Sequence, residues 1–421
     1  MRPAEAEPGR RSRRLAAAGV LFQGGAAAID TGTLIAALVQ GLTGSAVAVG
    51  AAAAIARAGW PVPQLFVGYA AQRRARRMPF YSAGAFGRAV CLVVLAGVLA
   101  WATELPPSAV VALFFALWTV YAFVGGIVAV PYNDIVARAV PSERRSRLLA
   151  ARFFGGGLLA LGVAAAAHRL LAALPFATAY AAIVLLGAVL FLLSAVSFVS
   201  AGEPPVPQDI SRAFGLRSYL RDGVAVFRND RRFRLFLYAQ WLSGMAAMAF
   251  PFYVIEATTS SGAAPRVALF LGAQTAGALL SNPLWGWWGD RLGKRSLLEV
   301  VAALGVGAPL LTLIWTAIGM GWPGIDVPWF AAVFLLLGAV GNGATIAQLG
   351  YLMEISPDER RPAYSGYFNA LAAPATLLPL AGAAVAQGIS FAALFAASVA
   401  AALLQFLAVR RLRTPLLDVR E

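Results

Sequence analysis

Residues 286–295 read Gly-Trp-Trp-Gly-Asp-Arg-Leu-Gly-Lys-Arg, and residues 68–77 read Gly-Tyr-Ala-Ala-Gln-Arg-Arg-Ala-Arg-Arg. Each stretch directly follows an apolar run that is long enough to cross a bilayer. A second pair recurs at nearly the same offset, Pro-Ser-Glu-Arg-Arg at 141–145 and Pro-Asp-Glu-Arg-Arg at 357–361. The two offsets are 218 and 216 residues. Two matches at one spacing indicate two related six-helix halves of parallel topology.

The composition excludes a water-soluble fold. Of 421 residues, 60% are hydrophobic and 13% are charged, and the mean hydropathy is +0.73, whereas a soluble domain has about 25% charged residues. Only helices or a closed barrel satisfy the backbone in hydrocarbon, and long unbroken apolar runs select helices. The sequence therefore predicts an all-α integral membrane protein with twelve spans. They are expected at residues 16–41, 45–71, 79–102, 108–134, 150–172, 175–200, 234–256, 266–289, 296–319, 327–354, 362–386 and 389–409.

Basic loops alternate with loops that are nearly free of arginine and lysine, which hold only Arg169 and Arg266 near their edges. Because basic loops face the cytoplasm, we expect both termini there. These loops also account for the net charge of +15, so we expect no nucleic-acid partner. The basic set is Arg10, Arg11, Arg13, Arg14, Arg73, Arg74, Arg76, Arg77, Arg144, Arg145, Arg147, Arg291, Lys294, Arg295, Arg360, Arg361, Arg410, Arg411 and Arg413.

The predicted domains are an N-terminal six-helix bundle at 1–200, a cytoplasmic linker at 201–233 and a C-terminal six-helix bundle at 234–421. The linker mixes prolines, arginines and aromatic residues, a pattern that suits an amphipathic helix on an anionic membrane surface. A plain linker and a regulatory or partner-binding role are both open. One cysteine, Cys91, and one histidine, His168, provide no disulfide and no metal framework. We expect a monomer in the lipid bilayer, with no cofactor.

The loop after the eighth span resembles the G-x-x-x-D-R-x-G-R-R signature of the major facilitator superfamily. The residues that carry this resemblance are Gly286, Asp290, Arg291, Gly293, Lys294 and Arg295. In that family the loop acts as a conformational latch between the two access states, and the alternative is a set of ordinary loop charges. The resemblance implies the superfamily's fold of two pseudo-symmetric bundles. The first-half copy is degenerate, since Gln72 replaces the acid and Ala75 a glycine. That copy consists of Gly68, Gln72, Arg73, Arg76 and Arg77.

Three charges lie deep inside the first three predicted spans, near mid-bilayer, where an ionised group costs about 2.5–3.5 kcal/mol. Counting ~1.5 Å per residue from the nearest loop arginine puts Asp30 and Arg57 at a depth of ~24 Å and Arg88 at ~17 Å. Asp30 and Arg57 lie at matched depth on adjacent antiparallel helices, so we expect an ion pair. Either the pair is fixed and orients two helices, or Asp30 exchanges a proton while Arg57 or Arg88 binds an anionic group.

Four further residues complete the expected cavity. Gln274 and Asn342 lie midway along second-half spans, and Trp118 and Tyr121 add an aromatic wall on the fourth span. The alternative for each is helix–helix hydrogen bonding or packing. A largely apolar cavity with a few amides and one charged wall suits a small amphiphilic solute. One acid with two bases leaves excess positive charge, which favours an organic anion.

The sequence therefore predicts a secondary active transporter for a small organic solute, working by alternating access and coupled to protons, or another cation, through Asp30. A non-transporting scaffold, assembly factor or sensor on the same fold is one alternative. A cation-coupled sugar-type symporter is another, because Asp30 and the Pro131-Tyr132 pair are similar to residues of that group. The spans hold no cluster of histidine, cysteine and acidic residues for catalysis, so we expect no enzyme.

Overall fold

The computed structural model describes residues 8–64, 67, 76–140, 142–204, 216–261, 265–318, 324–357 and 361–412. Its contacts divide the chain into two compact units. Unit 1 comprises Met1–Gly44, Ile55–Ala213 and Ala264–Gly272, and unit 2 comprises Ser45–Ala54, Phe214–Ala263 and Ala273–Glu421. The domain borders expected at 200 and 234 stay a prediction, and 205–215 of the expected linker lies outside the described residues.

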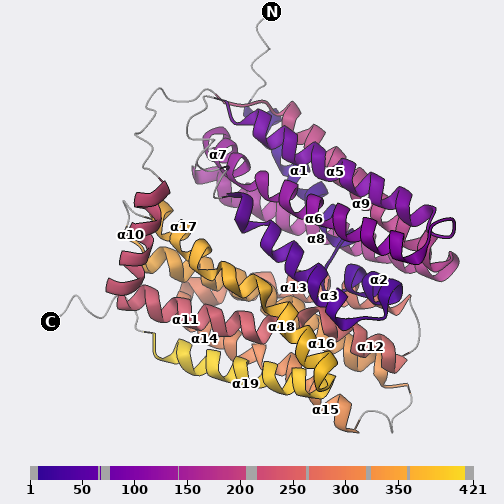
Figure 1. Ribbon diagram of the computed structural model, residues 1–421. Helices are drawn as coiled ribbons and strands as arrows, with labels where there is room; N and C mark the ends of the chain where they lie inside the picture. Colours follow the sequence, from indigo (N-terminus) through magenta and orange to yellow (C-terminus); the bar gives the residue numbers. More distant parts are fainter. Residues whose placement is uncertain are drawn as a thin grey trace, which may run out of the picture. The chain divides into compact units, whose positions relative to one another are not determined.

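Helices are the regular elements of the described residues (Figure 1). The first half has α1 Pro8–Ala28, α2 Leu34–Thr43, α3 Ala46–Gly59, α5 Met78–Ala100, α6 Pro107–Ile127, α7 Ala129–Ala139, α8 Ser142–Ala173 and α9 Phe176–Ser200. The second half has α10 Leu216–Asn229, α11 Arg231–Ala246, η1 Ala247–Phe252, α12 Tyr253–Ser261, α13 Arg266–Arg291, α14 Lys294–Gly305, α15 Gly307–Ile318, α16 Asp326–Ile355, α17 Arg361–Ala372, η4 Ala373–Leu377, α18 Leu378–Gly388 and α19 Phe391–Arg410.

Among the described residues, eleven helices are long and apolar enough to cross a membrane. The remaining predicted span, 16–41, is interrupted: α1 ends at Ala28 and the short apolar α2 begins at Leu34. The expected all-α membrane fold is confirmed, and the protein is a multi-pass membrane protein. The expected orientation of its termini stays a prediction.

The interruption of the first span has a local chemical cause. Residues 30–33 read Asp-Thr-Gly-Thr, all poor helix formers, and Asp and Thr side chains compete for backbone groups. The Gly32 amide and the Thr33 hydroxyl both donate to Asp30 Oδ1, at 3.0 and 2.8 Å. The Asp30 carbonyl accepts from the Ile35 amide at 2.9 Å. These bonds replace part of the helical ladder, so expecting one continuous helix over 16–41 was wrong.

In unit 1, α1 packs against α8 and α9, and α5 packs against α6 and α9 (Figure 1). Small residues let these helices approach closely. A Cβ added at Gly25 of α1 would lie 3.1 Å from the Phe191 ring and 3.2 Å from the Gly187 carbonyl of α9. This packing holds α1, α5 and α9 around the polar side chains described below.

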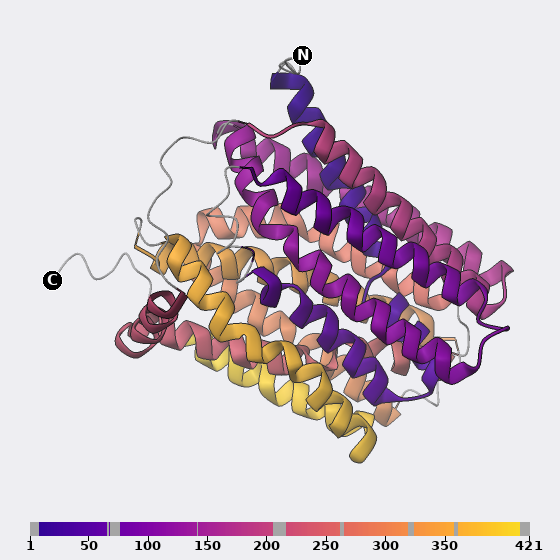
Figure 2. The ribbon, with the colours of Figure 1, turned by 45° about the horizontal axis from the view of Figure 1, so that its top comes forward.

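In unit 2, α19 packs against α11, and Figure 2 shows the yellow α19 alongside it. The backbones of α13 and α16 meet at Gly277 and Gly338. Tryptophan anchors the same contact, because the Trp285 indole donates to the Ala339 carbonyl at 2.8 Å. The pair α13 and α16 therefore forms a tightly fitted element of unit 2.

Candidate functional site

Unit 1 contains a cavity of about 250 Å³. Four of the seven residues that the sequence predicts for a cavity line it, namely Asp30, Arg88, Trp118 and Tyr121. They come from the break after α1, from α5 and from α6, and Phe191 of α9 completes one wall. Discontinuous helices of this kind form solute and ion sites in many transporters.

Arg88 is buried, with only 2% of its surface exposed. Its guanidinium lies between two aromatic rings, with Cζ 4.8 Å from the Phe22 centroid and 4.4 Å from the Phe191 centroid. Such cation–π contacts offset part of the desolvation cost of a buried cation. Within the described part of the chain, Nε and Nη2 of Arg88 have no hydrogen-bond partner. Arg88 is thus a buried cation with two unbonded donors, and its side chain lines the cavity.

Trp118 and Tyr121, the residues expected to form an aromatic wall, lie on α6 and line the cavity. Trp118 is fully buried and stacks on Tyr121, with ring centroids 5.0 Å apart and an interplanar angle of 20°. Phe114 extends the stack, at 5.9 Å from Trp118. The sequence spacing of these residues puts them on one helix face, so the same stripe serves both as core and as cavity wall.

Arg57 lies near the end of α3 and is half-buried. Its neighbours Ala56 and Trp60 line the 250 Å³ cavity, and Arg57 is not among the described residues that do. The ion pair expected between Asp30 and Arg57 stays a prediction.

The two predicted amides belong to unit 2. Asn342 of α16 donates from Nδ2 to the Ala278 carbonyl at 3.1 Å and to Asn282 Oδ1 at 2.8 Å, both on α13. These contacts are helix–helix hydrogen bonds, the alternative weighed from the sequence, and the expected place of Asn342 in a solute cavity stays a prediction. Gln274 of α13 is half-buried, and its Oε1 is a buried acceptor without a partner in the described structure.

In the loop between α13 and α14, Lys294 Nζ lies 2.8 Å from Asp290 Oδ1. Gly293 has φ = 86°, a conformation that disfavours residues with a side chain, and it begins α14. Arg295 donates to the carbonyl of Arg410 at the end of α19, at 3.0 Å. Arg291 lies over the Trp287 ring, and Gly286 has open space around it. The latch function of this loop stays a prediction.

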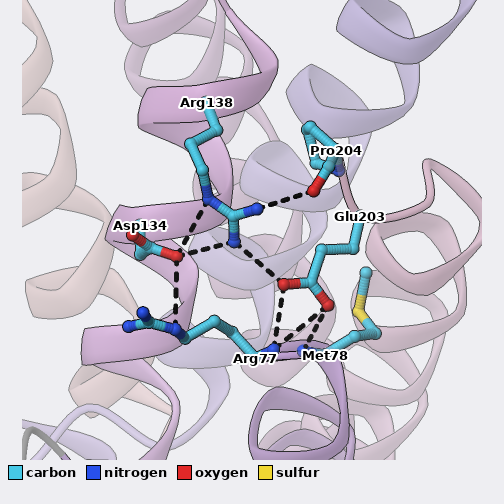
Figure 3. A network of polar contacts seen from close by, with 6 residues as sticks. All are labelled: Arg77, Met78, Asp134, Arg138, Glu203 and Pro204. Carbon is cyan, nitrogen blue, oxygen red and sulfur yellow. Dashed lines mark hydrogen bonds and ion pairs between the residues drawn. The ribbon is translucent and has the colours of Figure 1, made fainter. Parts of the chain in front are cut away.

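In the first-half loop, Gly68, Gln72 and Arg73 lie outside the described residues. Arg77 is described, and it joins a network of polar contacts with residues that the sequence did not single out (Figure 3). Arg138 donates to Asp134 Oδ2 at 2.6 Å and to Glu203 Oε1 at 2.9 Å. Its third partner is the Pro204 carbonyl, at 2.6 Å.

Glu203 also accepts from the backbone amides of Arg77 and Met78, at 2.9 Å each for the shorter contacts. These amides open α5, so the carboxylate caps the positive end of a 23-residue helix. Burial alone would raise the pKa of the Glu203 carboxyl, but the bonds from Arg138, Arg77 and Met78 together hold it below its ordinary value. The i,i+4 spacing of Asp134 and Arg138 is the sequence signal for half of this network.

Replacing Glu203 with glutamine is expected to lower the free energy of unfolding by about 1–3 kcal/mol, because Arg138 loses an ion pair and α5 loses its charged cap. A carboxyl with a lowered folded-state pKa stabilises above its unfolded pKa of about 4.3, and this stabilisation is lost as the pH falls through the folded value. Thermal melts of both proteins in detergent should therefore differ at pH 6–7 and converge toward pH 3. A pH-independent difference would contradict this account, and Glu104→Gln, at an exposed loop carboxylate, is the control.

Solved transporter structures share this fold over nearly the whole chain. A mutant form of the nucleoside transporter NupG has a TM-score of 0.74 at 11% identity, covering 96% of this chain and 99% of that one. A D-xylose-proton symporter has a TM-score of 0.69 at 17% identity, covering 97% and 100%. Residues 239–419 match the family profile of the Major Facilitator Superfamily. The chain has the fold of these transporters, and its second half matches the Major Facilitator Superfamily.

The profile match and the shared fold confirm the resemblance noted from the loop between α13 and α14. An auto-inhibited peptide transporter of the POT family has the same fold, with a TM-score of 0.73 at 12% identity, covering 96% of this chain and 98% of that one. By sequence, the uncharacterized protein Rv2209 of Mycobacterium tuberculosis and its Mycobacterium bovis counterpart, Mb2232, are 26% identical over 311 residues. The match covers 73% of this chain but 59% of theirs, so the chain spans less than two thirds of these relatives.

Proposed function

We propose that this protein is a secondary active transporter that moves a small organic anion across the bacterial cytoplasmic membrane by alternating access, with Asp30 carrying the coupled proton. One observation carries the proposal: Arg88 is a buried guanidinium with two open donors at a cavity of about 250 Å³. A buried charge is costly unless it is paired and hydrogen-bonded. A carboxylate or similar anion in the cavity would supply both the charge and the acceptors.

The solved structures of the same fold support a small organic solute, since they are named as nucleoside, peptide and D-xylose transporters. Proton coupling is supported by the position of Asp30. It lines the same cavity as Arg88 and lies in a break of the first span. Acids within membrane-spanning segments most often mark transport paths. An anion arriving at Arg88 changes the field at Asp30, which links solute binding to protonation.

The test is proton release from purified protein in weakly buffered detergent, followed with a pH indicator, on adding small organic anions and neutral amphiphiles. We expect ligand-dependent release from the natural protein and none from Asp30→Asn. Asparagine keeps a side-chain oxygen that accepts from Gly32 and Thr33, so the break in the first span should survive. Glu104→Gln is the control for loss of an acid elsewhere. Ligand binding without release in either protein would show that Asp30 has a structural role.

A further inference from the structure

A second, smaller cavity of about 120 Å³ adjoins the first in unit 1. The two share three lining residues, Phe22, Trp60 and Arg88. The second cavity is also lined by another cation, Arg152 of α8. From the sequence alone, Arg152 looks like a residue at the membrane surface, because it follows the loop arginines closely. Arg88 therefore faces two spaces, and one of them contains a further guanidinium.

Arg152 is held in place but retains an open donor. Its Nη1 donates to the Tyr132 hydroxyl at 2.8 Å, and its Cζ lies 5.1 Å from the Tyr132 ring centroid. Its Nε is buried and has no partner in the described structure. Ser194, which also lines this cavity, is already used, since its hydroxyl donates to the Ala18 carbonyl at 2.7 Å. The guanidinium is thus a fixed group with capacity for an acceptor.

The two arginines lie near the same aromatic ring. Arg88 Cζ lies 4.8 Å and Arg152 Cζ 5.5 Å from the centroid of the same Phe22 ring. The two guanidinium carbons are therefore separated by no more than the sum of these distances. Among the described residues neither arginine has a carboxylate partner within ion-pair distance. Two like charges this close in an apolar region repel each other unless anions lie between or beside them.

We propose that the transported solute carries two acidic groups, one bound by Arg88 in the larger cavity and the other by Arg152 in the smaller one. The solute class is a short linear dicarboxylate, whose methylene groups would lie against Phe22 and Trp60. Guanidinium groups bind carboxylates through parallel hydrogen bonds in a fixed geometry, so two of them set both charge number and spacing. This inference rests on the proposed function and specifies its substrate.

The experiment compares matched acids binding to the full-length protein in detergent by calorimetry. The probes are linear dicarboxylates of three to six carbons and the monocarboxylates of equal length, such as pentanedioate and pentanoate. The best dicarboxylate is expected to bind about 10- to 100-fold more tightly than its partner, the effect of one added charged hydrogen-bonding group. In Arg152→Gln this preference should vanish while the affinity for the monocarboxylate stays unchanged. Arg88→Met should abolish detectable binding of both acids.

Three controls keep the outcomes separate. Arg152→Lys retains the charge and should keep much of the preference, and Tyr132→Phe removes the contact that fixes Arg152 and should reduce it. Arg169→Gln changes an exposed arginine on the same helix and should leave the affinity for both acids unchanged.

Equal affinity for both acids in the natural protein would overturn the dicarboxylate inference while leaving the proposed anion transport standing. Binding that depends on chloride, with Arg152→Gln abolishing only that dependence, would overturn it in favour of a separately bound inorganic ion. Absence of both binding and proton release would contradict the proposed function itself.

Discussion

Replacing Arg88 with methionine is expected to abolish solute binding and transport yet leave the protein as stable as before, or more so. The loss of binding follows because a hydrogen bond to a charged group contributes about 1.5–3 kcal/mol, and Arg88 has two open donors for an anion. The gain in stability follows because methionine removes a buried, incompletely bonded charge. It also keeps a polarisable chain between the Phe22 and Phe191 rings.

Two measurements on the same sample test whether transport is lost while stability is kept. Uptake into proteoliposomes should fall to background, while the melting temperature in detergent should stay level or rise. Arg169→Met, at an exposed position on α8, is the matched control and should leave both unchanged. A variant that melts several degrees lower would show that Arg88 is a structural group that stabilises the fold through its packing. Normal uptake would remove the observation on which the proposed function depends.

Replacing Gly338 with alanine should separate two helices of unit 2. A Cβ at this position would clash with the Gln274 carbonyl oxygen and lie 3.0 Å from the Ala278 amide nitrogen, both on the α13 backbone. No rotamer change relieves a clash with backbone, so α16 must move away from α13. The movement would stretch the bonds from Asn342 to Ala278 and from Trp285 to Ala339. Overpacking costs about 1–3 kcal/mol, and valine should cost more.

The measurement is the melting temperature of the purified variant, together with the amount of protein that accumulates in membranes. We expect Gly338→Ala to melt several degrees lower and Gly338→Val to fail to accumulate. Gly341→Ala, on the same helix, is the control, because a Cβ at Gly341 would have no other atom within 4 Å. That substitution should be neutral or slightly stabilising, since alanine favours a helix over glycine by about 1 kcal/mol. Equal behaviour of the two alanine variants would contradict a backbone contact at Gly338.

Much of the fold follows from the sequence because each span carries its own signal. Apolar runs of membrane length, separated by arginine-rich loops, require no knowledge of tertiary contacts. The break at residues 29–33 was not predicted, because hydropathy is averaged over about 18 residues whereas the break depends on four side chains. Its only local sign is the run Asp-Thr-Gly-Thr, which reads as polar but not as an interruption.

Residues of the candidate site could be predicted from the sequence where a charge interrupts an apolar run. Asp30 and Arg88 stood out for that reason, and the structure puts both on one cavity. Arg152 did not, because it follows the loop arginines closely and resembles a side chain that reaches the membrane surface. Glu203 could not be connected to Arg77, 126 residues earlier, without the packing that joins them. Contacts between residues this far apart in the sequence depend on the tertiary structure and cannot be predicted from the spacing of residues along the chain.

The interruption after α1 joins the proposed proton carrier, Asp30, to the path of the main chain. Asp30 Oδ1 accepts two hydrogen bonds that stand in for missing helical ones, and a carboxylate accepts more strongly than a neutral carboxyl group. If Asp30 carries the coupled proton as proposed, the joint between α1 and α2 would be firmest with the carboxylate ionised and would loosen on protonation. The proposed transport cycle would then include a change in the stiffness of the first span.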